Sequence, residues 1–241
     1  MRILIVNDDG VGASQLPGLI RFCRTMGEVT AVVPKFEQSG KSHGIELHKP
    51  FEAKQVEIAP DITVWAVDST PADCVRFGVL GLKKEYDLVI SGVNRGLNVG
   101  VDMMYSGTVG AACEAVNLGI QAIALSTSFR NYENATVQLE RVFDFVREKD
   151  LLAIHDLYNI NIPDGEPKGI RFTHQGGPYY SDEFIPIGND MYSPRGFAIW
   201  KDSGDDTLDT DATIHGYITI TPLTTNKTDL ALYRKLSGLA E

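Results

Sequence analysis

The length, composition and charge of the chain exclude several classes of protein. The chain has 241 residues and a formal net charge of −10, and a chain of this length buries roughly 70–75% of its unfolded surface without staples. The acidic balance argues against nucleic-acid and membrane-surface partners, because phosphate groups select clustered Lys and Arg. Cys23, Cys74 and Cys113 are widely separated in apolar patterns, which indicates buried thiols and not a disulfide framework.

The sequence begins directly on a strand pattern, and no apolar run of about 18 residues follows that could span a membrane. The five histidines show no zinc spacing. We therefore expect a cytoplasmic protein with no membrane segment and no zinc site.

The first ten residues hold two adjacent carboxylates at the end of a strand. Residues 2–6 (RILIV) predict a strand buried on both faces, and Asn7, Asp8, Asp9 and Gly10 end it. Ligands bind at the carboxyl ends of strands in open α/β sheets, so the two carboxylates are candidates for a binding site. A solvated acidic turn explains the same residues equally well at this point.

A helix and a second strand follow. Ser14 is expected to cap a helix that extends to Gly27, and residues 29–33 predict the next strand. A β-α-β opening implies a right-handed crossover and a parallel sheet.

The loop at residues 34–44 contains QSGKS, but a P-loop needs a glycine where the chain has Lys35. Residues 44–58 instead alternate like two strands. Ser39 and Gly40 follow the second parallel strand and so are expected at the same sheet edge as the carboxylates, although a lone loop serine is commonly a turn residue.

Residues 62–67 predict another strand, followed by a helix that Thr70 caps and Pro71 begins. Asp73 near the start of that helix suits the helix dipole, which favours a structural role.

A strand over residues 88–90 leads into a loop rich in Gly and Asn at residues 91–100. The side-chain amides of Asn94 and Asn98 offer oxygen ligands or N–H donors, and the position after a parallel strand favours a functional loop over a simple turn.

Ser106, Gly107 and Thr108 then open a helix over residues 109–118. Free backbone N–H groups at a helix N-terminus bind anions. Simple capping by either hydroxyl accounts for the same residues.

A strand at residues 122–126 and a helix with its apolar face between residues 135 and 146 complete the first part of the chain. Beyond about residue 157, short strands alternate with loops, and residues 228–239 predict a closing helix. The strands are expected at residues 159–162, 170–173, 197–200 and 214–221. An exposed hairpin near residues 180–210 would suit either subunit contacts or cover for the core.

These elements predict one α/β domain over residues 1–241. It has a Rossmann-like, mostly parallel sheet with helices on both faces, and a β-rich C-terminal excursion from about residue 157. Residues 1–130 form the part that carries the site.

The loops at this sheet edge supply complementary chemistry. Hard anionic and neutral oxygens suit Mg²⁺ or Mn²⁺ better than zinc, and the donors suit an anion beside the metal. The oxygen ligands are Asp8, Asp9, Ser39 and Asn94, and the anion donors are Asn98, Ser106, Gly107 and Thr108. Together they predict a metal-assisted phosphate site.

Several short blocks, in order across residues 1–126, resemble the signature blocks of the SurE family of metal-dependent nucleotidases. The blocks are residues 7–10 (NDDG), 38–40 (QSG), 70–75 (TPADCV), 91–98 (SGVNRGLN) and 105–109 (YSGTV), with later matches at 209–211 and 216–223. The resemblance implies a cytoplasmic 5'/3'-nucleotidase that binds one divalent cation per site and forms a homodimer or homotetramer. It implies metal ligation by Asp8, Asp9, Ser39 and Asn94, and substrate binding by Asn7, Gly40, Asn98, Ser106, Gly107 and Thr108.

Two segments depart from the family pattern. Residues 41–46 read KSHGIE, and residues 175–178 (QGGP) replace a more basic stretch. These departures concern base preference and leaving-group contacts and leave the metal ligands intact.

The chemistry that fits these groups is hydrolysis of a phosphomonoester by a metal-activated water. Asp8 is a candidate general base or nucleophile, and Asn98, Ser106 and Thr108 would hold phosphoryl oxygens. One rival is a receiver-like signalling module with Asp68 as acceptor, but residues 124–128 lack the lysine it requires. The other rival is a catalytically silent nucleotide-binding protein.

Overall fold

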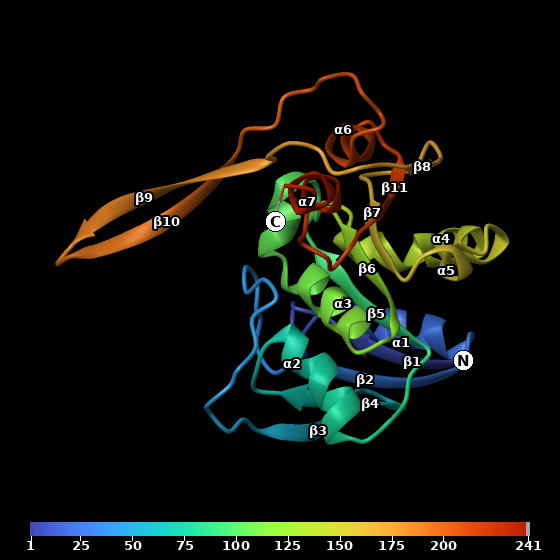
Figure 1. The fold of residues 1–241 in the computed structure, drawn as a ribbon. Coiled ribbons are helices and arrows are strands. Elements are labelled where there is room, and N and C mark those ends of the chain that lie inside the picture. Colours follow the sequence, from blue (N-terminus) through green and yellow to red (C-terminus); the bar gives the residue numbers. More distant parts are fainter. Residues whose placement is uncertain (240–241) are drawn as a thin grey trace.

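The computed structural model describes residues 1–239 (Figure 1). Its strands are β1 (Arg2–Val6), β2 (Glu28–Pro34), β3 (Ala53–Ala59), β4 (Ile62–Val67), β5 (Leu88–Arg95), β6 (Gln121–Thr127), β7 (Leu157–Ile162), β8 (Ile170–Phe172), β9 (Tyr180–Gly188), β10 (Met191–Ala198) and β11 (Ile218–Pro222). Its α-helices are α1 (Leu16–Arg24), α2 (Pro71–Arg76), α3 (Gly107–Asn117), α4 (Leu139–Glu148), α5 (Leu151–Ile154), α6 (Asp209–Ile214) and α7 (Leu230–Ser237).

The central sheet of the described residues has nine strands in the order β3-β4-β2-β1-β5-β6-β7-β11-β8. The run from β4 to β7 is parallel, whereas β3 and β11 are antiparallel to β4 and β7. The predicted Rossmann-like, mostly parallel sheet is thus confirmed. The chain moves from β1 to β2 on one side and later returns to place β5 on the other, so the carboxyl ends of β1 and β5 flank a topological switch point.

Helices cover both faces of the sheet (Figure 1) because β1 is apolar on both of its faces. Ile3 and Ile5 pack in one core layer with α1 and α4. Leu4 and Val6 pack in the other layer with α2 and α3. Alternate side chains of one strand therefore join two cores, which fixes the position of the turn that follows it.

Two predictions in the first part of the chain are wrong. Ser14 does not cap α1: the cap is Gln15, without a side-chain hydrogen bond, and the Ser14 hydroxyl donates to Glu133 instead. Residues 44–58 form one strand and not two, since only Ala53–Ala59 finds a partner strand. Alternation alone cannot make a strand where no neighbour accepts its hydrogen bonds.

The C-terminal part differs from the sequence prediction in its boundaries. The expected strand at residues 214–221 is the end of α6 followed by β11, and the hairpin is β9–β10, which ends at Ala198 rather than near residue 210. The expected strand at residues 197–200 is only the end of β10. Buried thiols are confirmed for Cys23 and Cys74, whereas Cys113 is only partly buried.

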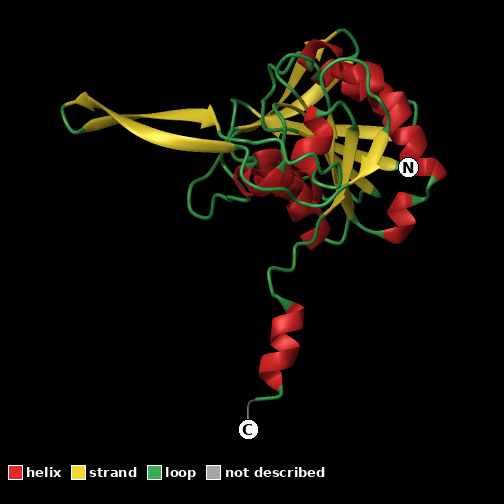
Figure 2. Ribbon diagram, turned by 90° about the horizontal axis from the view of Figure 1, so that it is seen from above, coloured by secondary structure: helices red, strands yellow, loops and turns green. Residues whose placement is uncertain are grey.

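Two C-terminal elements extend away from the body of the protein. The β9–β10 hairpin projects to one side, and Figure 2 shows α7 standing clear on a connecting segment. No residue of α7 is buried, although the helix is capped by the Asp229 carboxylate, which accepts from Leu232 N. None of the helices in the described part of the chain is both long and apolar enough to cross a membrane.

Candidate metal and phosphate site

The turn after β1 is closed by its own side chains. The Asn7 amide donates to Gly10 O and accepts from Gly10 N, both at 3.1 Å, and Asn7 is buried. Gly10 has φ +86°, and a Cβ there would lie 3.0 Å from the Phe36 carbonyl carbon. Glycine is therefore required, and the predicted substrate residue Asn7 uses its amide to hold the turn.

Asp8 is buried and held from the N-terminus of α3. Thr108 Oγ1 donates to Asp8 Oδ1 at 2.6 Å, and Thr108 N donates to Asp8 Oδ2 at 3.3 Å. A Cβ on Gly107 would come within 3.1 Å of Asp8 Cβ, so the small residue lets the carboxylate approach the helix end. Burial raises the pKa of Asp8 above its ordinary value, and the Thr108 hydrogen bonds oppose that rise.

Asp9 is partly buried and contacts other segments than Asp8 does. Its Oδ2 accepts from Arg95 N at 3.0 Å and from the Tyr132 hydroxyl at 3.3 Å. Burial, followed by repulsion from Asp8, raises the pKa of Asp9 to about 6. The two carboxylates are therefore held close enough to repel each other.

The two loop asparagines differ in what their side chains contact. Asn94 Nδ2 donates to Gly96 O at 2.8 Å, which leaves Oδ1 as its ligand atom. Asn98 is anchored in a buried polar cluster, because its Nδ2 donates to Ser126 Oγ and its backbone N donates to Asn161 Oδ1, both at 2.8 Å.

Ser106 is the N-cap of α3. Its Oγ accepts from Val109 N at 3.1 Å, so the hydroxyl hydrogen is free to donate elsewhere. Ser39 is exposed, and its hydroxyl donates to Glu37 Oε1 at 2.7 Å. Gln38 N donates to Asp8 O at 2.7 Å, which ties the segment before Ser39 to the acidic turn.

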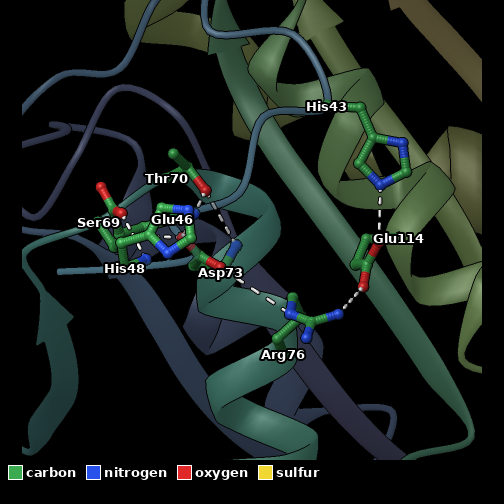
Figure 3. Close-up of polar contacts among 8 residues, drawn as sticks. All are labelled: His43, Glu46, His48, Ser69, Thr70, Asp73, Arg76 and Glu114. Carbon is green, nitrogen blue, oxygen red and sulfur yellow. Dashed lines mark hydrogen bonds and ion pairs between the residues drawn. The ribbon is translucent and has the colours of Figure 1, made fainter. Parts of the chain in front are cut away.

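The segment that carries Ser39, residues 35–52 between β2 and β3, is here called the Ser39 loop. A polar network fastens it to α2 and α3 (Figure 3). Glu114 of α3 lies between His43 Nε2 at 2.7 Å and Arg76 Nη1 at 3.0 Å. Asp73 Oδ2 accepts from Glu46 N at 2.8 Å and from the Ser69 hydroxyl at 2.6 Å, which confirms its predicted structural role.

A cavity of about 660 Å³ lies at this sheet edge and brings six of the predicted site residues together. They are Asp8, Ser39, Gly40, Asn94, Asn98 and Ser106. The other predicted residues lie next to these. Thr108 and Gly107, at the start of α3, lie against Asp8. Asp9 is the next residue of the turn, and the Asn7 side chain holds that turn. A cavity of this volume suits a drug-sized ligand.

The donor set fits a hard divalent cation. The Asp8 carboxylate lines the same cavity as Asn94 and Ser39, and Asp9 is the next residue of the turn. Carboxylate, amide and hydroxyl oxygens are the ligand types that Mg²⁺ and Mn²⁺ take. Burial raises the pKa of both carboxyl groups, and repulsion from Asp8 adds to the rise at Asp9. A cation bound by both carboxylates would oppose both shifts.

The structure adds residues that sequence reasoning missed. Tyr132 and the backbone of Arg95 hold Asp9, and Asn159 and Asn161 hold the backbone of Asn98. The two β7 asparagines had a sequence signal, since they interrupt an otherwise apolar strand, LYNINI. No sequence signal indicated Tyr132, because 123 residues separate it from Asp9.

Comparison with known proteins gives the family of the chain. A family model described as "Survival protein SurE" matches residues 3–182. A protein of Thermoanaerobacter sp. (strain X514) named 5'-nucleotidase SurE is 38% identical and aligns over 92% of each chain. A protein of the same name from Clostridium beijerinckii is 35% identical over 100% of both chains. The crystal structure of the SurE protein from Aquifex aeolicus has a TM-score of 0.77 and 31% identity, covering 100% of both chains.

The fold and the site define an α/β protein with a hard-oxygen site at the switch point of its sheet. The extent of the family match and the identity to full-length relatives show which family this protein belongs to. The chain belongs to the SurE family.

Proposed function

We propose that this SurE-family chain is a metal-dependent phosphomonoesterase that hydrolyses nucleoside 5'- and 3'-monophosphates to nucleoside and phosphate in the cytoplasm. The observation that carries this is the buried Asp8 carboxylate, which is held by the N-terminus of α3 and lines the same cavity as Asn94 and Ser106. The names of the relatives support the 5'-nucleotidase activity.

Asp8, Asp9, Ser39 and Asn94 would hold one Mg²⁺ or Mn²⁺. When bound, the cation supplies an activated water and neutralises charge on a phosphoryl oxygen. Asp8 would orient the attacking water and take its proton, and Thr108 fixes the carboxylate by two hydrogen bonds.

Ser106 and Asn98 would hold the remaining phosphoryl oxygens. The Ser106 hydroxyl still has a hydrogen to donate, and Asn98 is set in place by Ser126 and Asn161. The role of these residues is positioning and charge stabilisation, which is most of what phosphoryl transfer needs from a protein.

Phosphate release from AMP tests the proposal. Turnover should need Mg²⁺ or Mn²⁺ and stop with EDTA, and Asp9→Asn should lower kcat/KM by roughly three orders of magnitude because a metal ligand is lost. Asp190→Asn, at the exposed turn between β9 and β10, is a matched control that should keep full activity. AMP binding without release would mean a silent nucleotide-binding protein.

The stereochemistry at phosphorus separates two roles of Asp8. Hydrolysis of a monophosphate whose phosphorus is made chiral with oxygen isotopes should invert the configuration, because water attacks phosphorus directly. Retention of configuration would show that Asp8 attacks phosphorus and is not the general base. The receiver-like rival lacks support, because Asp68 follows β4, on the far side of β2 from the acidic turn.

We further propose a homodimer or homotetramer built through the C-terminal elements. Phe184, Ile187 and Tyr192 of the hairpin and Leu236 of α7 are each more than half exposed, and apolar side chains gathered on projecting elements are typical of subunit contacts. The double variant Leu232→Ser and Leu236→Ser should lower the mass measured by light scattering. An unchanged monomer mass in both proteins would rule the assembly out.

A further inference from the structure

We propose that Asp209, the first residue of α6, is a positioning residue for the phosphate side of the site. Asp209 does not itself line the cavity. Its carboxylate instead fixes the backbone next to Asn98, whose side chain would hold a phosphoryl oxygen. The inference rests on the proposed function and extends the same site into the C-terminal part of the chain.

The Asp209 carboxylate is buried and joins two segments that are far apart in the sequence. Asp209 is 0% exposed. Its Oδ1 accepts from Gly176 N at 2.8 Å, and its two oxygens accept from Gly100 N at 3.1 and 3.0 Å. Burial raises the pKa of Asp209, and these backbone hydrogen bonds oppose the rise. Because a buried carboxylate without donors is very unfavourable, the carboxylate and the two segments hold one another in place.

The segments around Asp209 leave no room for side chains at the two glycines. Gly100 has φ +58°, and a Cβ there would overlap Gly177 O. A Cβ on Gly176 would overlap the Thr210 hydroxyl. Packing this close transmits a displacement and does not absorb it. A change at Asp209 would therefore move the backbone of Gly100.

The backbone that Asp209 holds carries a proposed phosphate donor and part of the cavity wall. Gly100 lies two residues after Asn98 and begins the 3₁₀ helix Gly100–Tyr105, whose Asp102 lines the cavity. A side chain of β7 binds the backbone N and O of Asn98 on one side. Asp209 supplies the anchor on the other side, so its loss should shift Asn98 relative to a bound phosphate.

The proposed metal ligands Asp8 and Asp9 depend on other contacts. Thr108 donates to Asp8, and the backbone N of Arg95 donates to Asp9. Neither donor is bonded to Asp209, whose backbone partners are in the segments at residues 100 and 176. The loss of Asp209 should therefore weaken phosphate binding more than Mg²⁺ binding.

Asp211, two residues further along α6, offers a matched control. It is 1% exposed, its Oδ1 accepts from Ser203 N at 2.8 Å, and its Oδ2 accepts from the Thr210 hydroxyl at 3.1 Å. These partners belong to α6 and to the segment that returns from the hairpin, and they do not line the cavity. The same substitution at the two positions removes the same buried charge, but at Asp209 it also disturbs the backbone beside Asn98.

Calorimetric titration of the Mg²⁺-loaded protein with inorganic phosphate tests the inference. In Asp209→Asn one acceptor oxygen becomes an NH₂ group, which cannot accept from the backbone N of Gly100 or Gly176. We expect phosphate to bind about tenfold more weakly and kcat/KM for AMP to fall about a hundredfold, whereas Mg²⁺ affinity without phosphate should be unchanged. Asp211→Asn should keep both phosphate affinity and kcat/KM.

Two results of this titration would overturn the inference. One is an equal phosphate affinity in Asp209→Asn and Asp211→Asn, whether or not it differs from that of the unchanged protein. The other is an equal loss of Mg²⁺ and phosphate affinity in Asp209→Asn, because the whole site would then be disturbed.

Hydrogen exchange in the unchanged protein gives a second measurement, which does not depend on the folding of a variant. Gly100 N donates to Asp209, and Ser203 N donates to Asp211. Because phosphate should favour the anchored backbone, adding it to the Mg²⁺-loaded protein should slow exchange of the Gly100 amide by about tenfold. The Ser203 amide should exchange as before. Equal changes at the two amides would overturn the inference.

The proposed function can fail separately from this inference. A protein that binds phosphate with Mg²⁺ but releases none from AMP would contradict the proposed function, and phosphate affinity and hydrogen exchange would still decide the role of Asp209. A protein that binds no phosphate at all would overturn the inference itself.

Discussion

Two regions of the molecule differ in which side chains they bury. One is the sheet edge that carries the candidate site, and the other comprises the projecting C-terminal elements. Around the site, Asp8, Asp73 and Asn98 are buried and each makes hydrogen bonds. On the hairpin and α7, apolar side chains such as Phe184 and Leu236 are exposed. These polar groups of the first region find hydrogen-bond partners within the chain, whereas the second region presents a surface that suits contact with another molecule.

We expect the two regions to differ most in the stability lost when a glycine is replaced by alanine. In Gly92→Ala the new Cβ would lie 2.2 Å from the Leu125 carbonyl oxygen, at φ +145°, whereas Gly188 has open space around it at φ +91°. We expect Gly92→Ala to lower the free energy of unfolding by more than about 4 kcal/mol, and Gly188→Ala by about 1–2 kcal/mol. Urea unfolding measures both, and equal losses would break the comparison.

Removing the hydroxyl behind Asp8 should have the next largest effect. Thr108→Val keeps the shape but leaves Asp8 Oδ1 without its 2.6 Å donor, and we expect a loss of roughly 1–3 kcal/mol in stability. Because Asp8 would then be held from α3 only by the longer 3.3 Å bond from the backbone N of residue 108, kcat should fall by about a hundredfold with KM for AMP changed much less. Thr108→Ser should restore most of kcat. Failure of the serine variant to do so would show that packing, and not the hydrogen bond, is what matters.

One glutamate in each region allows the same comparison for a charged side chain. Glu114 is 9% exposed between Arg76 and His43, whereas Glu183 on the hairpin is 51% exposed, 3.5 Å from Arg195. Glu114→Gln should lower stability by about 1–3 kcal/mol, and Glu183→Gln by less than about 0.5 kcal/mol. Because Glu114 fastens the Ser39 loop, its variant should also weaken Mg²⁺ binding, measured by calorimetry. Glu183→Gln should not.

The smallest effect is a pH dependence in the C-terminal part. Hydrogen bonds to Asp206 and Asp202 raise the pKa of His215 above its ordinary value. The folded state therefore binds the His215 proton more tightly than the unfolded state does. The resulting stabilisation of the fold is complete below the unfolded-state pKa of about 6.5. It is lost as pH rises through the higher pKa of the folded state. His215→Gln should flatten the pH dependence of the melting temperature over that range. An unchanged profile would contradict the shift.

The sequence predicted the elements whose signals are local. An apolar run that stops at NDDG, or a Thr-Pro pair before an apolar helix, contains both the element and its boundary, and β1 and α2 lie where expected. The edge that gathers Asp8, Ser39, Asn94 and Ser106 also followed from strand order, because parallel strands end at one side of a sheet.

Contacts between segments far apart in the sequence could not be predicted from such local signals. Tyr132 reaches Asp9, and Glu114 reaches His43, across 123 and 71 residues. The helix α6 was missed because six residues give too short a period to detect, and its Asp209 is buried by bonding Gly100 N and Gly176 N.

The root of the hairpin has a mechanical consequence. Strand β9 has nine residues, so the hairpin is an arm of about 30 Å, and Asp102 binds its first residues while also lining the cavity. The Asp102 carboxylate therefore joins the base of the arm to the wall of the cavity, which the first residues of β9 also line. A movement of the arm would change the shape of the cavity through these contacts.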